Sequence, residues 1–137
     1  MPTAPETRRT WVYKPPRKET TAARGYGYDW RKLSARFRAR WPHCVLCLLL
    51  GRSVAPTAAV CDHITPHAHN PQRRLDYRNL QTLCAKPHDN DKRKAEIGGS
   101  PVAQWARVLQ SAAATCPLPP EVVRPLIPPH VWGLIDG

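Results

Sequence analysis

The sequence predicts a small α+β fold in which two short strands lie among several helices. Two segments show apolar residues at helical spacing, two short runs have the composition of strands, and a Cys-x2-Cys pair precedes the first of these runs. The 137 residues suit one domain with tails, because domains usually have about 100–150 residues. A chain of this size with 16 prolines has little apolar surface to bury, so we do not expect a deep-pocketed α/β enzyme. A bound metal is an expected stabiliser.

The charge of the chain favours a polyanionic partner. Lys and Arg number 21 against 10 Asp and Glu, which gives a net charge of +11. Such an excess attracts phosphate backbones, although a basic protein without a specific partner, or one drawn to anionic lipid, can have the same composition. No run of about 18 apolar residues predicts a membrane span. Residues 1–18 show no apolar stretch before a cleavage site, so we expect no secretory signal and a reducing compartment.

The first predicted helix covers about residues 30–41 and follows a basic arm. Residues 1–23 combine basic side chains with little apolar periodicity, which predicts a flexible segment. The helix begins near Asp29, a candidate cap, and ends before Pro42. Its apolar face repeats at i, i+3, i+7 and i+11: Trp30, Leu33, Phe37 and Trp41. Its other face is rich in arginine. Arg36 and Arg40 are therefore candidate DNA contacts, unless this face is only solvated.

Two strands and two further helices follow. Residues 59–64 read as a short strand that Pro66 stops, and residues 79–84 as the return strand of a hairpin. Residues 88–97 predict a charged helix closed by Gly98-Gly99. The last predicted helix covers 100–116, with Ser100 as its cap and Pro101 in its first turn. Its apolar stripe consists of Val102, Trp105, Leu109 and Ala112 or Ala113.

The predicted division of the chain has four parts. They are the arm 1–23, a core of residues 24–99, the helix 100–116, and residues 117–137. The last part holds six prolines in 21 residues and is expected to be an extended tail that suits docking to a partner.

The cysteines indicate a metal site. Five cysteines are an odd number, which argues against a disulfide framework. Cys44-Val45-Leu46-Cys47 has the spacing at which two thiolates bind one tetrahedral zinc from a tight turn. Cys84 opens a second such pair, but Pro87 stands where its partner is expected. The fourth ligand stays open among Cys61, His43, His88 and water. A Cys-x2-Cys can also be a redox pair or two small buried residues. Cys116 is expected to play no part.

Asp62-His63, Asn79 and His88 are the candidate catalytic residues. Phosphodiester hydrolysis needs an activated water and a charge to oppose that of the phosphate, and a histidine with an ordinary pKa near 6.5 suits the role of base. Adjacent residues of a regular strand point to opposite faces. For Asp62 and His63 to reach one phosphate, the strand must therefore bend or end beside them.

These motifs together resemble the HNH endonucleases. The resemblance covers about residues 24–97 and rests on Cys44-x2-Cys47, on Cys61-Asp62-His63-Ile64-Thr65-Pro66-His67, and on Asn79-Leu80-Gln81-Thr82-Leu83-Cys84 with His88. Asn79 lies 16 residues after His63, and His88 lies 9 residues after Asn79, spacings that are ordinary for the family. Small phage-type members, with a zinc knuckle around a ββα-metal (His-Me finger) core, are the most similar. Arg24-Gly25-Tyr26-Gly27, with Trp30, also resembles phage versions found beside packaging genes.

The resemblance implies a metal-dependent DNA endonuclease that nicks or cuts duplex DNA with low sequence specificity. His63 would deprotonate the water, and Asn79 would fix the orientation of the His63 ring. Asp62 and His88 would hold Mg²⁺ or Mn²⁺, or else Ni²⁺ or Zn²⁺. A structural zinc would be bound by Cys44, Cys47 and Cys84. The implied setting is a phage protein, monomeric in the host cytoplasm, that assists the terminase in packaging.

Basic residues around the motif are the remaining candidate DNA contacts. His67 ends the family string and is a possible phosphate contact, or else a solvent-facing loop residue. The charged residues that bracket the motif are expected to contact the DNA backbone: Arg73, Arg74, Arg78, Lys92 and Arg93. Two alternatives stay open. One is a non-catalytic zinc-knuckle DNA-binding module, in which Asp62 and His63 are relics. The other is an interaction protein that uses its proline-rich end.

Overall fold

The structure is a computed structural model that describes residues 26–52, 59–66, 68–85, 88–97 and 100–137; the side chains of residues 88–90 lie outside this description. The predicted arm, residues 1–23, is also outside it. The elements, in chain order, are α1 (Tyr28–Arg40), α2 (Val45–Leu49), β1 (Ala59–His63), η1 (Pro71–Arg73), η2 (Tyr77–Asn79), β2 (Leu80–Cys84), α3 (His88–Glu96), α4 (Pro101–Ala114), α5 (Pro120–Val123), η3 (Arg124–Leu126) and α6 (Pro129–Asp136). This arrangement confirms a small α+β fold.

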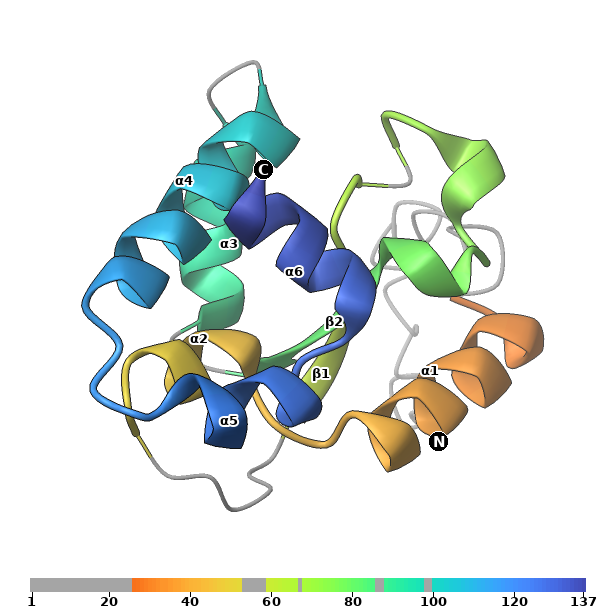
Figure 1. Cartoon of the computed structure of the whole chain (residues 1–137). Helices are drawn as coiled ribbons and strands as arrows, with labels where there is room; N and C mark the ends of the chain where they lie inside the picture. The colour runs from red at the N-terminus through yellow and green to blue at the C-terminus, as the bar shows by residue number, and fades with distance from the viewer. Residues whose placement is uncertain (1–25, 53–58, 67, 86–87, 98–99) are drawn as a thin grey trace, which may run out of the picture.

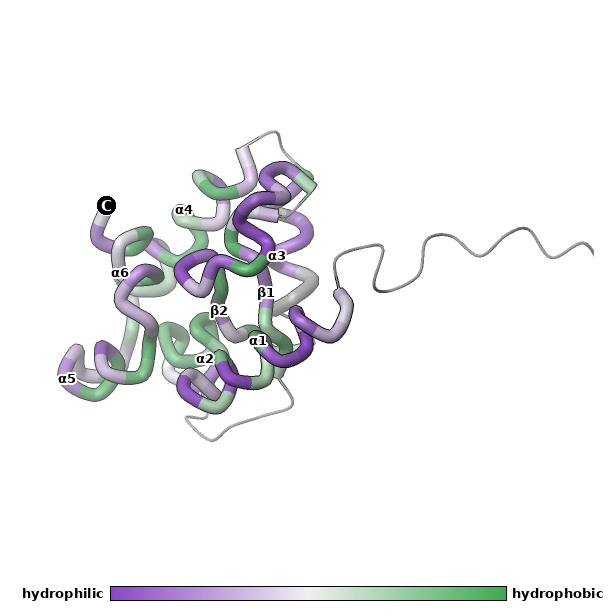
Figure 2. The backbone as a smooth tube through the Cα atoms, turned by 90° about the vertical axis from the view of Figure 1, so that its right-hand side faces the viewer, coloured by the Kyte–Doolittle hydropathy of each residue, from purple (hydrophilic) through white to green (hydrophobic). Residues whose placement is uncertain are grey.

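The two strands form an antiparallel hairpin with helices on both sides (Figures 1 and 2). Its register pairs Ala59 with Cys84 at one end and His63 with Leu80 at the other. Residues paired across an antiparallel sheet share a face. The face of His63 and Thr82 meets α1, since Thr82 Oγ1 donates to the carbonyl oxygen of Trp41 at 2.5 Å. The face of Asp62 and Gln81 meets α3 and α4.

Two clusters of buried side chains hold these layers together. The larger one joins α2 and β2 to α4 and α6, with Leu48, Leu83, Trp105 and Leu109 fully buried. The smaller one lies under α1 and contains Trp30, Phe37, Trp41 and Leu80. Both follow the predicted apolar stripes, so the helical periodicity of α1 and α4 is confirmed. By contrast, α3 is hydrophilic over most of its length (Figure 2).

The start of α1 differs from the expectation. The helix begins at Tyr28 after Gly27, and Asp29 lies in its first turn instead of capping it. The Asp29 carboxylate accepts hydrogen bonds from the Trp30 amide and from Arg74. Asp29 therefore ties the first turn of α1 to the loop between the strands.

The expectation of an extended tail after residue 117 is wrong. This segment forms α5, η3 and α6, and Val123, Ile127 and Val131 are only 2%, 1% and 0% exposed. Pro120 and Pro129 each stand at the start of a helix, where the missing amide hydrogen costs nothing because it has no partner inside the helix. These two prolines thus mark helix starts, and the three buried apolar residues follow one another at intervals of four positions. None of the helices in the described ranges is long and apolar enough to cross a membrane.

Substitution of two adjacent valines tests the packing of this C-terminal segment. Val123 is 2% exposed and Val122 is 45% exposed. We expect Val123→Ala to lower the free energy of unfolding by about 2 kcal/mol, because it removes two buried methyl groups. Val122→Ala should change it by less than about 0.5 kcal/mol. Denaturant unfolding measures both, and equal small effects would contradict a packed C-terminal segment.

The buried His130 should make stability depend on pH. Burial lowers the pKa of His130 below 6.5, and its Nε2 contacts the Leu80 carbonyl oxygen at 2.6 Å. The unfolded chain, in which His130 has its ordinary pKa, therefore binds the proton more readily than the folded protein. The contribution of neutral His130 to the free energy of unfolding is complete above about pH 6.5 and is lost as the pH falls through the lower pKa of the folded state.

We expect the melting temperature to fall on going from about pH 8 to about pH 5, and to fall less in His130→Gln, which keeps a donor but does not titrate. Thermal unfolding at both pH values measures the difference. Identical falls in the two proteins would show that His130 does not contribute.

Candidate functional site

A pocket of about 500 Å³ opens beside the end of β1. Asp62 and His63 both line it, together with Arg93 and Glu96 of α3 and with Tyr26 before α1. Adjacent strand residues reach the same pocket here because β1 ends at His63. The condition derived from the sequence, a strand that ends beside the two residues, is met.

The ring of His63 is held on two sides. It is 5% exposed and stacks on Trp30 with a centroid separation of 4.3 Å and an interplanar angle of 24°. Its Nε2 lies 2.8 Å from the carbonyl oxygen of Arg74. A carbonyl oxygen can only accept, so Nε2 carries the hydrogen, and the neutral ring then has its lone pair on Nδ1.

Asn79 holds the loop that follows β1. It is fully buried, and its Oδ1 accepts from the Thr65 amide at 2.8 Å. Its Nδ2 donates to the carbonyl oxygens of Thr65 and Arg73, at 2.9 and 3.4 Å. Arg73 precedes the residue whose carbonyl binds His63. Asn79 therefore supports the orientation of His63 by fixing the backbone around it.

The Asp62 carboxylate is held by two neighbours from different elements. Its Oδ2 accepts from Gln81 Nε2 at 3.1 Å and lies 3.6 Å from Lys92 Nζ. The side chain of Asp62 is 16% exposed. A carboxylate on the wall of a pocket is a donor that Mg²⁺ and Mn²⁺ accept, so this residue fits a divalent ion.

Lys92 is not placed for the expected contact with DNA. It is 0% exposed, and Nζ lies 2.6 Å from Glu96 Oε1 and 3.2 Å from the carbonyl oxygen of His63. A buried ammonium needs such partners. Lys92 therefore ties α3 to the end of β1 and is not a surface charge. Lys92 is the first of three consecutive basic residues, and this run shows no apolar periodicity that would indicate a core position.

The other predicted DNA contacts fall into two groups. Arg36, Arg40, Arg78 and Arg93 are exposed, and Arg93 lines the pocket. Arg73 and Arg74 are partly buried in ion pairs with Asp76 and Asp29, at 3.1 and 2.9 Å. The hydrogen bond from Arg74 to Asp29 lowers the pKa of that carboxyl group. Arg73 and Arg74 thus form ion pairs that hold the loop between the strands. His67 lies outside the described residues.

His88 is the first residue of α3. Its side chain lies outside the described part of the structure, so its predicted role as a metal ligand stays a prediction. Arg93 and Glu96 of the same helix reach the pocket.

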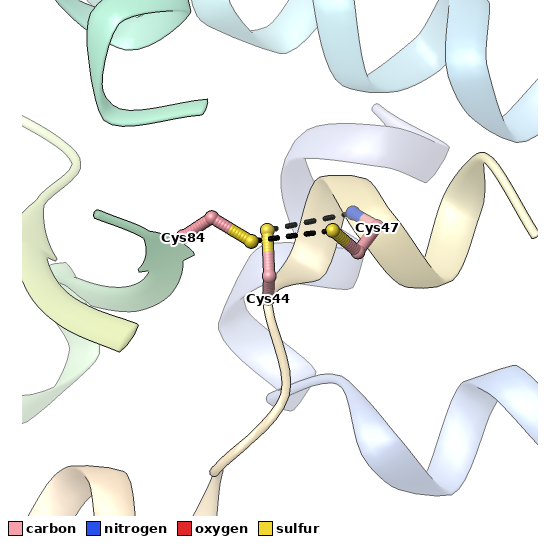
Figure 3. A group of neighbouring side chains, drawn as sticks. All are labelled: Cys44, Cys47 and Cys84. Atoms are coloured by element: carbon pink, nitrogen blue, oxygen red, sulfur yellow. Dashed lines mark hydrogen bonds between the residues drawn. The ribbon is translucent and has the colours of Figure 1, made fainter. Parts of the chain in front are cut away.

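Three cysteines meet where α2 approaches the end of β2 (Figure 3). The sulfur atoms of Cys44, Cys47 and Cys84 all lie within 4.8 Å of one another, and Cys47 Sγ is 3.3 Å from Cys84 Sγ. Cys44 caps α2 by accepting from the Cys47 amide at 3.4 Å. Tetrahedral zinc with Zn–S bonds of about 2.3 Å separates two sulfur ligands by about 3.8 Å. The cluster therefore fits zinc.

The environment of these cysteines opposes the thiolate form unless a cation is bound. Burial raises the pKa of Cys44 and of Cys47, and the neighbouring sulfur atoms raise it further. Three thiolates in such a place would repel one another unless a bound cation neutralises them.

Cys61 does not join this cluster within the described residues. It lies two positions along β1 from Ala59, the register partner of Cys84, which is about 7 Å along a strand. Cys61 packs instead against the smaller buried cluster under α1, and burial and the Asp62 charge raise its pKa to about 12. This position argues against Cys61 as the fourth zinc ligand.

The order of these features along the chain agrees with one known family. The model of the HNH endonuclease family matches residues 44–94, which include the three cysteines, both strands and most of α3. No curated protein and no solved structure matches the chain. The β1–β2–α3 succession is consistent with the ββα-metal fold that the resemblance implies. Residues 44–94, the matched part of this small α+β fold, are thus similar to an HNH endonuclease domain.

Proposed function

We propose that this protein is a metal-dependent endonuclease that hydrolyses phosphodiester bonds in double-stranded DNA, by nicking or by double-strand cleavage, with little sequence preference. The observation that carries the proposal is the pair of groups in the pocket of the HNH domain. A histidine with a fixed ring and a carboxylate line one wall, at the end of one strand. The basic composition of the chain supports a nucleic-acid substrate.

His63 is proposed as the general base. With Nε2 bonded to the Arg74 carbonyl, Nδ1 is the ring atom that takes the proton from the attacking water. The stacking on Trp30 and the loop held by Asn79 keep the ring in one orientation, so no rearrangement is needed at the moment of proton transfer.

Asp62 and His88 are the proposed ligands of the catalytic ion. An ion held by these two residues would oppose the charge that builds up on the phosphate and would stabilise the leaving oxygen. The ion is proposed to be Mg²⁺ or Mn²⁺, because a carboxylate and an imidazole leave several positions for water and phosphate oxygens.

The exposed arginines are the proposed contacts to the DNA backbone. Arg93 lines the pocket, and Arg36 and Arg40 are exposed on α1. Backbone contacts position a duplex but do not read bases, which supports low sequence specificity.

The three-cysteine cluster is proposed to hold a structural zinc. Its cysteines come from α2 and its cap and from the end of β2, so the bound ion would join these two elements.

The biological setting is proposed from the resemblance alone. The stretch around Tyr26-Gly27 and Trp30 resembles phage members found beside packaging genes, which supports a role for a monomer beside the terminase in the host cytoplasm.

A plasmid assay tests the nuclease function. We expect the purified protein to convert supercoiled plasmid to open-circular or linear DNA with Mg²⁺ or Mn²⁺, and EDTA to stop the reaction. His63→Ala should slow cleavage about 10²–10⁴-fold, the usual contribution of a general base, and should leave DNA binding largely intact.

The matched control for this test is His130→Gln at about pH 8, because His130 does not line the pocket and is neutral there. It should cut like the wild type. A His63→Ala variant that cuts normally would contradict the assigned base. Wild-type protein that binds DNA but cuts it with none of these ions would favour the non-catalytic DNA-binding module.

Removal of one cysteine tests the zinc. We expect elemental analysis to find about one zinc per chain, and Cys44→Ser to lose both the metal and the cooperative thermal transition, because structural zinc contributes folding free energy directly. The control is Cys116→Ser, since Cys116 is not part of the cluster. A Cys44→Ser protein without zinc that melts like the wild type would show that the cluster is not a structural metal site.

A further inference from the structure

A buried series of hydrogen bonds leads from the C-terminal half of the core to Asp62. Trp105 Nε1 of α4 donates to Gln81 Oε1 of β2 at 2.9 Å. Gln81 Nε2 donates to Asp62 Oδ2 of β1 at 3.1 Å. Both Trp105 and Gln81 are 0% exposed. In the sequence, Trp105 belongs to the apolar stripe of a predicted helix, and Gln81 has no predicted role.

The chemistry of the three groups fixes the direction of this series. An indole nitrogen can only donate, so the oxygen of the Gln81 amide must face Trp105. The NH₂ group of Gln81 is then turned toward Asp62, and an ionised carboxylate can only accept. If the amide oxygen and nitrogen of Gln81 were exchanged, its NH₂ group would face the N–H donor of Trp105. Its oxygen would then face the carboxylate oxygen of Asp62, which is also an acceptor. Trp105 thus selects the orientation in which Gln81 holds Asp62.

A second contact secures the same oxygen from the other side. Lys92 Nζ lies 3.6 Å from Asp62 Oδ2, and it is kept there by Glu96 Oε1 at 2.6 Å. The carboxylate is therefore held between β2 and α3. Buried polar groups cost free energy unless they are paired, and apolar residues of similar size often fill a core at no loss of stability. The polar character of position 81 is thus explained better by its effect on Asp62 than by stability.

We propose that Gln81 and Trp105 are positioning residues of the nuclease site, which orient the Asp62 carboxylate and thereby set its affinity for the divalent ion. This inference rests on the proposed function, because it takes Asp62 as a ligand of that ion. Partners that orient a ligating carboxylate typically change metal affinity or activity about 10–100-fold when they are removed. Trp105 lies outside the residues matched by the HNH family, 44–94, so a residue beyond the family domain takes part in its site.

Binding of Mn²⁺ to the zinc-loaded protein, without DNA, tests the inference. Titration followed by electron paramagnetic resonance gives the Kd. We expect Gln81→Met, which keeps the volume but removes the donor, to raise the Kd about 10–100-fold. Trp105→Phe should also raise the Kd. The Kd of the double variant should be little higher than that of Gln81→Met alone, because both changes act through the same hydrogen-bonded series. Trp132→Phe is the matched control, because its indole donates to the Arg124 carbonyl at an exposed position.

A second measurement reports on the hydrogen bonds without any metal. The indole N–H resonance of Trp105, identified by its loss in Trp105→Phe, should shift in both Gln81→Met and Asp62→Ala. If the variants only disturbed packing, they would lower the melting temperature without this shift of the indole resonance in Asp62→Ala. The effects of the two single variants on the Kd would then be additive in the double variant.

The outcomes separate the two proposals. If Asp62→Ala weakens Mn²⁺ binding but Gln81→Met binds like the wild type, the positioning role is wrong and the nuclease proposal stands. If the wild type binds no Mn²⁺, or if Asp62→Ala binds it as tightly as the wild type, Asp62 is not a ligand of the ion. The proposed metal site, and with it the positioning role, is then overturned.

Discussion

The register of the β1–β2 hairpin decides where every group of the site lies. Because Asp62 is paired with Gln81, and His63 with Leu80, the carboxylate faces the polar support from α3 and α4 while the imidazole faces the aromatic residues of α1. A slip of one residue would exchange these faces. It would place Asp62 against Trp30 and turn His63 toward Lys92. Among the described residues the sheet has two strands, so its register there is specified by what covers the two faces.

The two ends of the hairpin have different roles. At the Ala59–Cys84 end, the strand pair meets α2 through the three cysteines. At the His63–Leu80 end, the chain leaves the strand and the pocket opens. A short sheet in a small domain gains from a crosslink at one end, since small domains bury little apolar surface. The cysteine cluster is therefore placed where it can brace the hairpin without occupying the pocket.

Much of this arrangement could be predicted from local pattern. Both strands, α3 and α4 lie within two residues of their expected bounds, and the meeting of Cys44, Cys47 and Cys84 follows from spacing and resemblance. The features that could not be predicted depend on contacts between residues far apart in the sequence. Lys92 looked like one charge in a basic run, and only the packing of α3 against β1 shows that it is buried. The hydrogen bond between Gln81 and Trp105 joins residues that no sequence motif connects. The proline-rich end was misjudged because proline density outweighed the helical spacing of three apolar residues.

The packing of α4 and α6 against α2 and β2 also means that the packed core of this protein extends beyond the residues that match the family model. The family match stops at residue 94, but Trp105, Leu109 and Val131, all fully buried, come after it, and the cover of His63 comes from α1 before it. A polypeptide trimmed to the matched stretch would carry every signature residue and still expose the bare sides of its hairpin to solvent. Such a fragment would present open strand edges and apolar faces, the usual starting point for association between chains. Grafting this chemistry onto another scaffold would therefore require its helical surroundings as well.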